Sequence, residues 1–220
     1  MQRFFDVFFS VFAIVFLCPI LILIICILKL TGEGEVFYIQ ERVGQDGKVF
    51  GMLKFATMIK NSLNIGAGEI TICDDPRVLP FGKFLRKSKI NELPQLWNIV
   101  IGDMSIVGPR PMIPNTFANY SKRAQDRLNT VRPGLTGIGS IIFRDEERYL
   151  SGQKEPKEFY KKNISPYKSE IEIWFVENNS LWLYLKLIAV TVWIIMFPRS
   201  KIVDTAFKGL PNRHFPHSPT

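Results

Sequence analysis

The sequence has few of the side chains that build disulfide frameworks or histidine metal sites. It contains three cysteines and two histidines in 220 residues, and no pair of cysteines shows the CxxC spacing. Cys18 and Cys26 lie in an apolar run and Cys73 stands alone, so the pattern predicts a reducing compartment without disulfides. His214 and His217 lie in a proline-rich C-terminal stretch, which is more typical of a disordered end than of a metal site.

Acidic side chains are in the minority. The chain carries 28 Lys and Arg against 20 Asp and Glu, which gives a net charge of +8 at pH 7. This balance favours a polyanionic partner: nucleic acid, an anionic membrane surface or phosphorylated small molecules. A nucleic-acid-binding protein would not need the long apolar run near the N-terminus, so we expect no nucleic-acid partner.

Residues 7–28 form that run, which has no charged side chain and in which Ser10 is the only clearly polar one. As a helix it would extend roughly 33 Å, close to the hydrocarbon thickness of a bilayer, about 30 Å. The run is longer than the apolar region of a signal peptide, and no small-residue cleavage site follows before Lys29. We therefore predict a membrane segment that is retained.

The dipeptide Cys18-Pro19 lies in the middle of the apolar run. Proline removes a backbone donor and clashes with the preceding turn, so the helix should kink or break there. Two arrangements remain open: a kinked helix that spans the bilayer, and a re-entrant helix-break-helix that enters and leaves on one face. The flanking charges give no strong positive-inside asymmetry that would favour either.

Beyond this run the sequence predicts a mostly helical α+β domain. Residues 36–40 and 49–55 have the pattern of a short β-hairpin, with Gly47 in the turn. The apolar residues Leu93, Leu96, Trp97 and Val100 predict one face of a helix that ends at Gly102. Other expected elements are a short basic helix bearing Phe81, Phe84 and Leu85, a polar helix at 117–128, a strand at 140–143, and a mostly helical stretch at 144–177 that breaks near Ser165-Pro166.

Residues 181–197 form a second apolar segment, which is short for a membrane span and contains Lys186. Its tryptophans and tyrosine suit an amphipathic helix at the membrane interface, and a core helix is the other option. The same segment could also serve a homodimer.

Arginines occur on two proline-stiffened loops, "GPRP" with Arg110 and "RPG" with Arg132. A rigid backbone can preset the planar guanidinium for an oxyanion, although two turns with solvated arginines would look the same. Chemistry on phosphates commonly combines such cations with carboxylates that bind Mg²⁺. The available carboxylates are Glu92, Asp103, Asp74 and Asp75, and the other nearby cations are Arg86, Lys87 and Lys89.

Asn91 and Glu92 precede the predicted helix. Asparagine is a favoured N-cap, glutamate suits the first turn, and the missing N–H of Pro94 costs nothing there. Local physical chemistry alone therefore favours a capped helix start over a reaction centre.

The stretch "FGKFLRKSKINELPQLWNIVIGDMSIVGPRP", followed by "VRPGLTGIGS", resembles the bacterial sugar transferase family, the monotopic phosphoglycosyl transferases. The N-terminal "RFFDVFFS" with Cys18-Pro19, and "KFATM" around Lys54, match in the same order. The resemblance covers residues 3 to about 197.

The resemblance implies an enzyme that moves a sugar-1-phosphate from a UDP-sugar onto polyprenyl (undecaprenyl) phosphate with Mg²⁺, releasing UMP and starting a surface glycan. It implies three parts: a re-entrant membrane anchor (1–35) broken at Cys18-Pro19, a cytosolic, membrane-associated catalytic domain (36–200) and a flexible C-terminal tail (201–220). The expected location is the bacterial inner membrane, with the catalytic domain facing the cytoplasm and contacting membrane lipids.

The resemblance also places Asn91-Glu92 where the family has a catalytic Asp-Glu pair. It implies catalytic roles for Glu92 and Asn91, a Mg²⁺ site at Glu92, and substrate binding by Lys54, Arg86, Asp103, Arg110 and Arg132. The sequence departs from the family at Asn91, because a neutral amide is a poor nucleophile and a weak metal ligand. It also has Ala56 where an arginine is common.

The departure at Asn91 leaves three hypotheses. The chain is an active transferase, in which Glu92 acts as nucleophile or metal ligand or the lipid phosphate attacks directly. Alternatively it is a catalytically impaired relative that binds substrate or a partner, or the asparagine is an introduced change. We favour the active transferase because the other signature residues are present.

Overall fold

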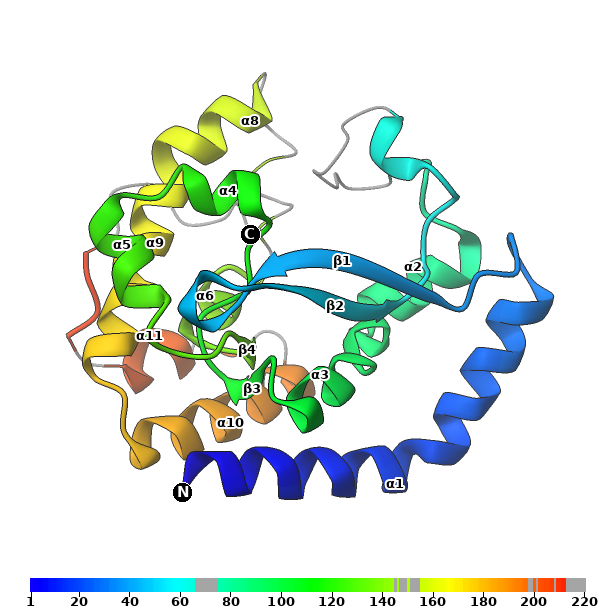
Figure 1. Cartoon of the computed structure of the whole chain (residues 1–220), viewed down its shortest axis with the longest axis horizontal. Helices are drawn as coiled ribbons and strands as arrows, with labels where there is room; N and C mark the ends of the chain where they lie inside the picture. The colour runs from blue at the N-terminus through cyan, green and yellow to red at the C-terminus, as the bar shows by residue number, and fades with distance from the viewer. Residues whose placement is uncertain are drawn as a thin grey trace.

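The computed structural model describes residues 1–65, 75–144, 146, 150, 155–197, 200, 202–207 and 209–212. Within them the protein is mostly helical, with two small two-stranded sheets (Figure 1). The expected α+β class is therefore confirmed. The predictions for Cys73, Asp74, His214 and His217 lie outside the described residues.

The elements follow in chain order. The helices are α1 (Gln2–Leu30), α2 (Pro80–Lys87), α3 (Gln95–Ile101), α4 (Pro114–Ala118), α5 (Lys122–Leu128), α6 (Ile138–Ile142), α8 (Pro156–Phe159), α9 (Ser165–Glu177), α10 (Leu181–Met196) and α11 (Ile202–Ala206). The strands are β1 (Phe37–Val43), β2 (Val49–Phe55), β3 (Ser105–Val107) and β4 (Gly134–Thr136). Short 3₁₀ turns occur at Gln45–Gly47, Ser62–Asn64 and Ile90–Glu92, and a π turn at Tyr160–Ile164.

Strands β1 and β2 form the predicted hairpin. They are antiparallel, with Phe37 opposite Phe55 and Val43 opposite Val49. The turn needs a left-handed backbone at Asp46 and Gly47, which glycine adopts at no steric cost. The second sheet is a short parallel pair in which Ser105 lies opposite Gly134.

Helix α1 is continuous through Cys18-Pro19. Figure 1 shows it changing direction along its length rather than stopping. Pro19 cannot donate to the helical ladder, which is the usual cause of such a bend.

Both ends of α1 are fixed to the rest of the protein. Near its start, Arg3 donates to the carbonyls of Ile99 and Val100 at 2.5 and 2.8 Å. The buried carboxylate of Asp6 accepts hydrogen bonds from Ser105 Oγ, the Ile106 amide and the Tyr184 hydroxyl, at 2.8 to 2.9 Å. Near its end, Ile24 and Leu28 pack in a core cluster with Phe55 and Leu85.

The middle of α1 is largely uncovered. Among the described residues α1 is the helix long and apolar enough to cross a membrane, and only 11% of its most apolar 18-residue window is buried. A helix in the core of a soluble protein would be mostly buried, so this surface points to membrane association. The exposed apolar side chains of α1 include Phe8, Phe12, Val15, Phe16, Ile20, Ile22 and Leu23.

Helix α10 combines the two roles that its sequence left open. Leu183, Leu187 and Val190 are buried in the largest core cluster, together with residues of α6 and α9. Its other face leaves Trp182 and Trp193 exposed, at 74% and 46%. The helix therefore closes the core on one side and presents aromatic side chains on the other.

Three local predictions are wrong. Residues 140–143 are not a strand, because α6 occupies 138–142 and the strand of this region is β4 just before it. Residues 117–128 divide into α4 and α5, since Ser121 Oγ accepts the amide of Ala124 and starts a new helix. No break occurs at Ser165-Pro166, because the π turn Tyr160–Ile164 runs directly into α9 and the local departure from α-helical geometry lies in that turn.

Candidate active site

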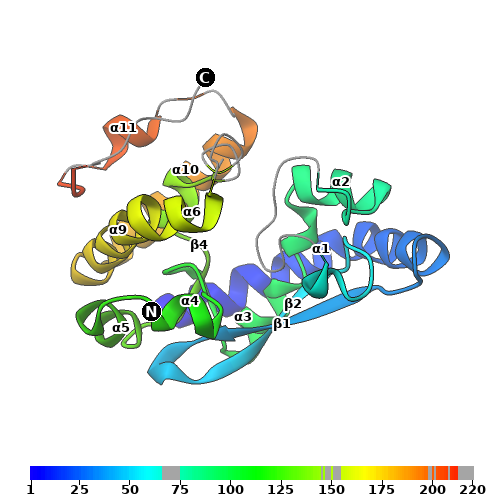
Figure 2. The same ribbon diagram turned by 90° about the horizontal axis from the view of Figure 1, so that it is seen from above.

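A large open cleft runs through the centre of the molecule, with a volume of about 2530 Å³. One side is built from the β1–β2 hairpin, α2 and the turn Ile90–Glu92, and the other from α6, α9 and α10. Figure 2 shows these two groups of elements on opposite sides of the molecule. Sites for one small ligand commonly measure about 300–1,000 Å³, so this cleft has room for more than one substrate.

Four charged residues of the predicted site line this cleft, and Asn91 lies beside one of them. Lys54 comes from β2, Arg86 from the end of α2, Glu92 from the turn before α3, and Arg110 from the "GPRP" loop after β3. Arg110 Nη2 lies 3.7 Å from Glu92 Oε1. Elements far apart in the sequence thus bring a carboxylate and several cations to one place.

The cations keep Glu92 charged. Burial alone would raise the pKa of its carboxyl, but the nearby positive charges outweigh this and hold the pKa below its ordinary value of 4.5. Those charges belong to Arg110, Lys54, Lys89 and Arg86. Glu92 is therefore ionised at neutral pH.

Lys54 shows the opposite balance. Its pKa falls to about 7, because burial disfavours the ammonium ion and the carboxylate of Glu92 offsets only part of that penalty. The guanidinium groups of Arg42, Arg110 and Arg86 lower it further. Near neutral pH Lys54 can therefore exist with or without its proton.

Asn91 does not cap α3. It lies inside the 3₁₀ turn Ile90–Glu92, which starts from a left-handed Lys89, and α3 begins only at Gln95 after Pro94. The N-cap prediction is wrong because the turn inserts between Asn91 and the helix. Asn91 lines the cleft at 8% exposure, and its Oδ1 finds no hydrogen-bond partner among the described residues. Such an atom is suited to a ligand.

Asp103 and Arg132 do not belong to the lining of this cleft. Asp103 Oδ2 accepts a hydrogen bond from Asn98, whose side chain also binds Leu53 N and Gly51 O of β2. Arg132 Nε donates to the carbonyl of Gly102 at 2.9 Å. Both contacts fix the end of α3 against its neighbours, so these two residues stabilise the helix that follows the turn carrying Glu92.

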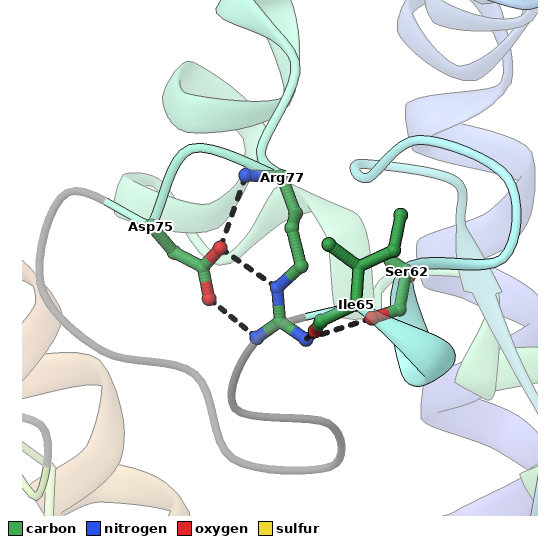
Figure 3. Close-up of polar contacts among 4 residues, drawn as sticks. All are labelled: Ser62, Ile65, Asp75 and Arg77. Carbon is green, nitrogen blue, oxygen red and sulfur yellow. Dashed lines mark hydrogen bonds and ion pairs between the residues drawn. The ribbon is translucent and has the colours of Figure 1, made fainter.

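Asp75 is among the residues that line the cleft and is engaged by Arg77 (Figure 3). Arg77 Nε and Nη2 donate to the two carboxylate oxygens at 2.8 and 2.5 Å, and its Nη1 binds the carbonyls of Ser62 and Ile65. Both residues are 3% exposed. This buried bidentate pair ties two chain segments together.

Sequence reasoning missed the charged residues of α9. Glu172 is 1% exposed, lines the cleft, and accepts the Arg110 backbone N–H on Oε1 at 3.2 Å. Lys168 Nζ lies 2.6 Å from Glu146 Oε2 and over the rings of Phe143 and Tyr160. One sequence signal was available: Lys168 and Glu172 lie four apart, on the face that carries Ile164, Ile171 and Phe175.

Burial raises the pKa of Glu172 from 4.5 to about 7, although Arg110 and Lys168 offset part of the shift. The folded protein then binds a proton between pH 4.5 and 7 that the unfolded chain releases, so stability falls as pH rises through 7. The loss would be roughly 3 kcal/mol at most. We expect Glu172→Gln to remove this loss, so that its melting temperature exceeds that of the wild type at pH 8 but not at pH 4.5.

Thermal unfolding in detergent at several pH values measures this difference. Glu170→Gln is the matched control, since Glu170 is an exposed carboxylate on the same helix and should leave the pH profile unchanged. Parallel profiles for the wild type and Glu172→Gln would contradict the assignment.

The residues present allow a divalent cation only together with substrate. Among the described residues no group of three histidines, cysteines or carboxylates could hold a metal ion. Mg²⁺, however, is commonly bound by one or two protein oxygens together with substrate phosphates. The carboxylate of Glu92 and the unpartnered Oδ1 of Asn91 provide such oxygens, so this pair fits the metal.

The sequence comparisons agree with the geometry. Residues 1–198 match the family described as bacterial sugar transferase, and the chain belongs to this family. An exopolysaccharide production protein, ExoY, from Sinorhizobium fredii is 38% identical over 68% of this chain and 72% of its own length.

Two further relatives differ in how much of their own length the match covers. An uncharacterized sugar transferase, EpsL, from Bacillus subtilis is 33% identical over 87% of this chain and 85% of its own length. The UDP-glucose:undecaprenyl-phosphate glucose-1-phosphate transferase of Klebsiella pneumoniae is 32% identical over 87% of this chain. That match covers only 39% of the Klebsiella protein, so the chain corresponds to part of it.

Proposed function

We propose that the protein transfers a sugar-1-phosphate from a UDP-sugar to polyprenyl phosphate at the cytoplasmic face of the bacterial inner membrane. The observation that carries this proposal is the ionised Glu92, placed among Lys54, Arg86 and Arg110 in a cleft large enough for two phosphorylated substrates. Relatives whose names state this type of reaction support it, with undecaprenyl phosphate as acceptor.

The chemistry is substitution at the phosphorus that bears the sugar. A nucleophile forms a new P–O bond, the bond to the bridging oxygen breaks, and UMP leaves with that oxygen. The nucleophile is Glu92, giving a phosphosugar-enzyme that the lipid phosphate then attacks, or it is the lipid phosphate itself. In both routes the cations of the cleft stabilise the charge that moves onto UMP.

Mg²⁺ is part of the proposal. When bound, it would neutralise phosphate charge and orient the diphosphate. Glu92 and Asn91 are the residues that would hold it. Arg110 and Lys54 then bind and orient the remaining phosphate oxygens.

The membrane arrangement follows from the contacts of α1. A straight helix of this length would extend roughly 43 Å and carry its far end away from the domain. Instead Arg3 and Asp6 contact α3, β3 and α10, while Ile24 and Leu28 contact β2 and α2. Because both ends contact one domain, we propose that α1 enters and leaves the membrane on the same face.

Cysteine labelling tests this topology. We expect Gln2→Cys and Thr31→Cys, introduced one at a time after Cys18, Cys26 and Cys73 are replaced by alanine, to react with an impermeant maleimide from the same side. Inside-out vesicles and intact spheroplasts provide the two sides. Labelling of the two positions from opposite sides would show a helix that spans the membrane.

One observation favours a second candidate, a catalytically impaired relative that binds substrate or a partner. The family's nucleophilic carboxylate would occupy position 91, and an amide cannot replace it as a nucleophile. In this case the cleft would bind UDP-sugar without turnover.

The two candidates are separated by UMP release. We expect the purified protein in nanodiscs, given Mg²⁺ and polyprenyl phosphate, to release UMP from at least one member of a UDP-sugar panel. Intact mass analysis without the lipid then shows whether a phosphosugar adduct forms on the enzyme. Binding of UDP-sugar with no UMP release across the panel would establish the impaired relative instead.

A further inference from the structure

The side of the cleft opposite Glu92 has unsatisfied polar atoms. Glu172 on α9 and Ser140 on α6 both line the cleft, and neither Glu172 Oε2 nor Ser140 Oγ has a hydrogen-bond partner among the described residues. Buried polar atoms in native proteins are nearly always paired, since an unpaired one costs about 1–3 kcal/mol. Two such atoms on one cleft wall indicate a ligand that supplies the missing bonds.

The fold holds the Glu172 carboxyl in a fixed position. Oε1 accepts the Arg110 amide, and a Cβ atom at Gly139 would lie 2.2 Å from that same oxygen. Glycine at position 139 therefore lets α6 approach the carboxyl closely. This packing commits one oxygen of Glu172 to the protein and leaves the other for the cleft.

The chemistry of this wall differs from that of the hairpin side. Lys168 is engaged by Glu146 at 2.6 Å, and Arg144 Nη1 donates to the Ile194 carbonyl at 2.9 Å. Among the described residues, the buried side-chain atoms of α6 and α9 that lack a partner are Ser140 Oγ and Glu172 Oε2. A carboxylate repels phosphate, whereas carboxyl and hydroxyl groups exchange hydrogen bonds with neutral hydroxyls. This wall therefore suits an uncharged, hydroxyl-bearing ligand.

Arg110 joins the two walls. Its guanidinium faces Glu92, and its backbone N–H binds Glu172. The cations beside Glu92 and the wall that carries Glu172 and Ser140 are thus separated by the length of a single residue, Arg110. A ligand with a diphosphate at one end and a ring of hydroxyls directly attached to it matches this arrangement.

We propose that Ser140 and Glu172 form a subsite for the hydroxyl groups of a neutral ring joined to the diphosphate, either the hexose or the ribose of a nucleotide sugar. This inference rests on the proposed function for its ligand. It makes Ser140 and Glu172 specificity-determining residues, separate from the charged centre at Glu92.

The test measures how much each substrate hydroxyl contributes to binding, in the wild type and in variants that lack each side chain. UDP-glucose and UDP-galactose are compared with their monodeoxy-hexose analogues and with the 2′-deoxyuridine forms, for the wild type, Ser140→Ala and Glu172→Gln. We expect one deoxy analogue to bind the wild type about 10-fold more weakly, the loss of about 1.4 kcal/mol typical of a hydrogen bond. Ser140→Ala should bind the complete UDP-sugar about 10-fold more weakly than the wild type does. Its affinity for that deoxy analogue should be no lower than its affinity for the complete UDP-sugar.

Binding is measured by the ligand-induced shift in melting temperature as well as by kcat/KM, so the result does not depend on turnover. Ser169→Ala is the matched control, because Ser169 lies on α9 outside the cleft lining and bonds the Pro166 carbonyl. The melting temperature without ligand shows that each variant is folded.

The outcomes are distinct. Coupling to a hexose hydroxyl supports the subsite and assigns it to the sugar, and coupling to the ribose 2′-hydroxyl supports it and assigns it to the nucleoside. Equal losses for every analogue in the wild type and both variants would overturn the subsite. Absence of UMP release from the wild type would refute the proposed transferase, while the binding data would still decide for or against the subsite.

Discussion

Glu92→Gln is expected to lower UMP release by roughly 10³-fold or more, since 10³ is about the upper end of the loss for removing one hydrogen-bonding group that stabilises a transition state. The substitution keeps the size of the side chain but removes the negative charge that faces Arg110 at 3.7 Å. In either route of the proposed reaction it removes a group acting at phosphorus, as nucleophile or as metal ligand. The effect should fall on kcat, measured as UMP release at saturating UDP-sugar.

Binding separates this loss of chemistry from a loss of the site. Measured without Mg²⁺, Glu92→Gln should bind UDP-sugar at least as tightly as the wild type, because Arg86 and Arg110 remain and one negative charge is gone. Glu35→Gln is the matched control: its carboxylate is also at the cleft, but it is 55% exposed and pairs with Lys60. A Glu92→Gln protein that releases UMP at the wild-type rate would exclude Glu92 from the reaction.

Sequence patterns were sufficient where the local signal and the tertiary structure agree. The hairpin β1–β2 combines alternating apolar residues with a glycine turn. The observed strand pairing and the left-handed Gly47 confirm the predicted strands and turn. The apolar run and Pro19 predicted a hydrophobic helix that kinks or breaks, and α1 changes direction without a break at Cys18-Pro19. In each case the physical cause, a side-chain period or a missing N–H, lies within the segment itself.

The patterns failed where distant residues decide. The N-cap prediction for Asn91 used favourable local chemistry, but the chain places a left-handed Lys89 and a 3₁₀ turn before α3. The two proline-stiffened arginines look alike in sequence, yet Arg110 lies beside Glu92 in the cleft and Arg132 binds the Gly102 carbonyl. Only the folded chain shows which guanidinium reaches the cleft.

Glu172 shows a different limit. A glutamate on a charged helix is ordinarily solvated. Its place on the helix face that carries Ile164, Ile171 and Phe175 is a weak local sign of burial. Its position depends on the close approach of α6 at Gly139 and on the Arg110 amide, from segments 33 and 62 residues away. Such an environment is created by packing and could not be predicted from the segment alone.

The second large effect is expected for Asn91→Asp, which should raise the rate of UMP release by roughly 10²-fold. Position 91 is 8% exposed, so a second carboxylate there would be costly if it stood alone. The cations that lower the pKa of Glu92 surround the same turn and offset part of the cost of a second negative charge. The substitution would thus add a nucleophile next to Glu92 in a site already built for negative charge.

Intact mass and peptide mapping complete this experiment. With Asn91→Asp we expect a phosphosugar adduct in the absence of lipid phosphate, on the peptide that contains position 91. Asn91→Ala is the companion variant, because it removes the amide oxygen without adding charge and should lower the rate below that of the wild type. If Asn91→Asp gives no gain and Asn91→Ala a loss, the amide itself takes part in the reaction. The wild type would then use Glu92 or direct attack by the lipid phosphate, with Asn91 as a working member of the site.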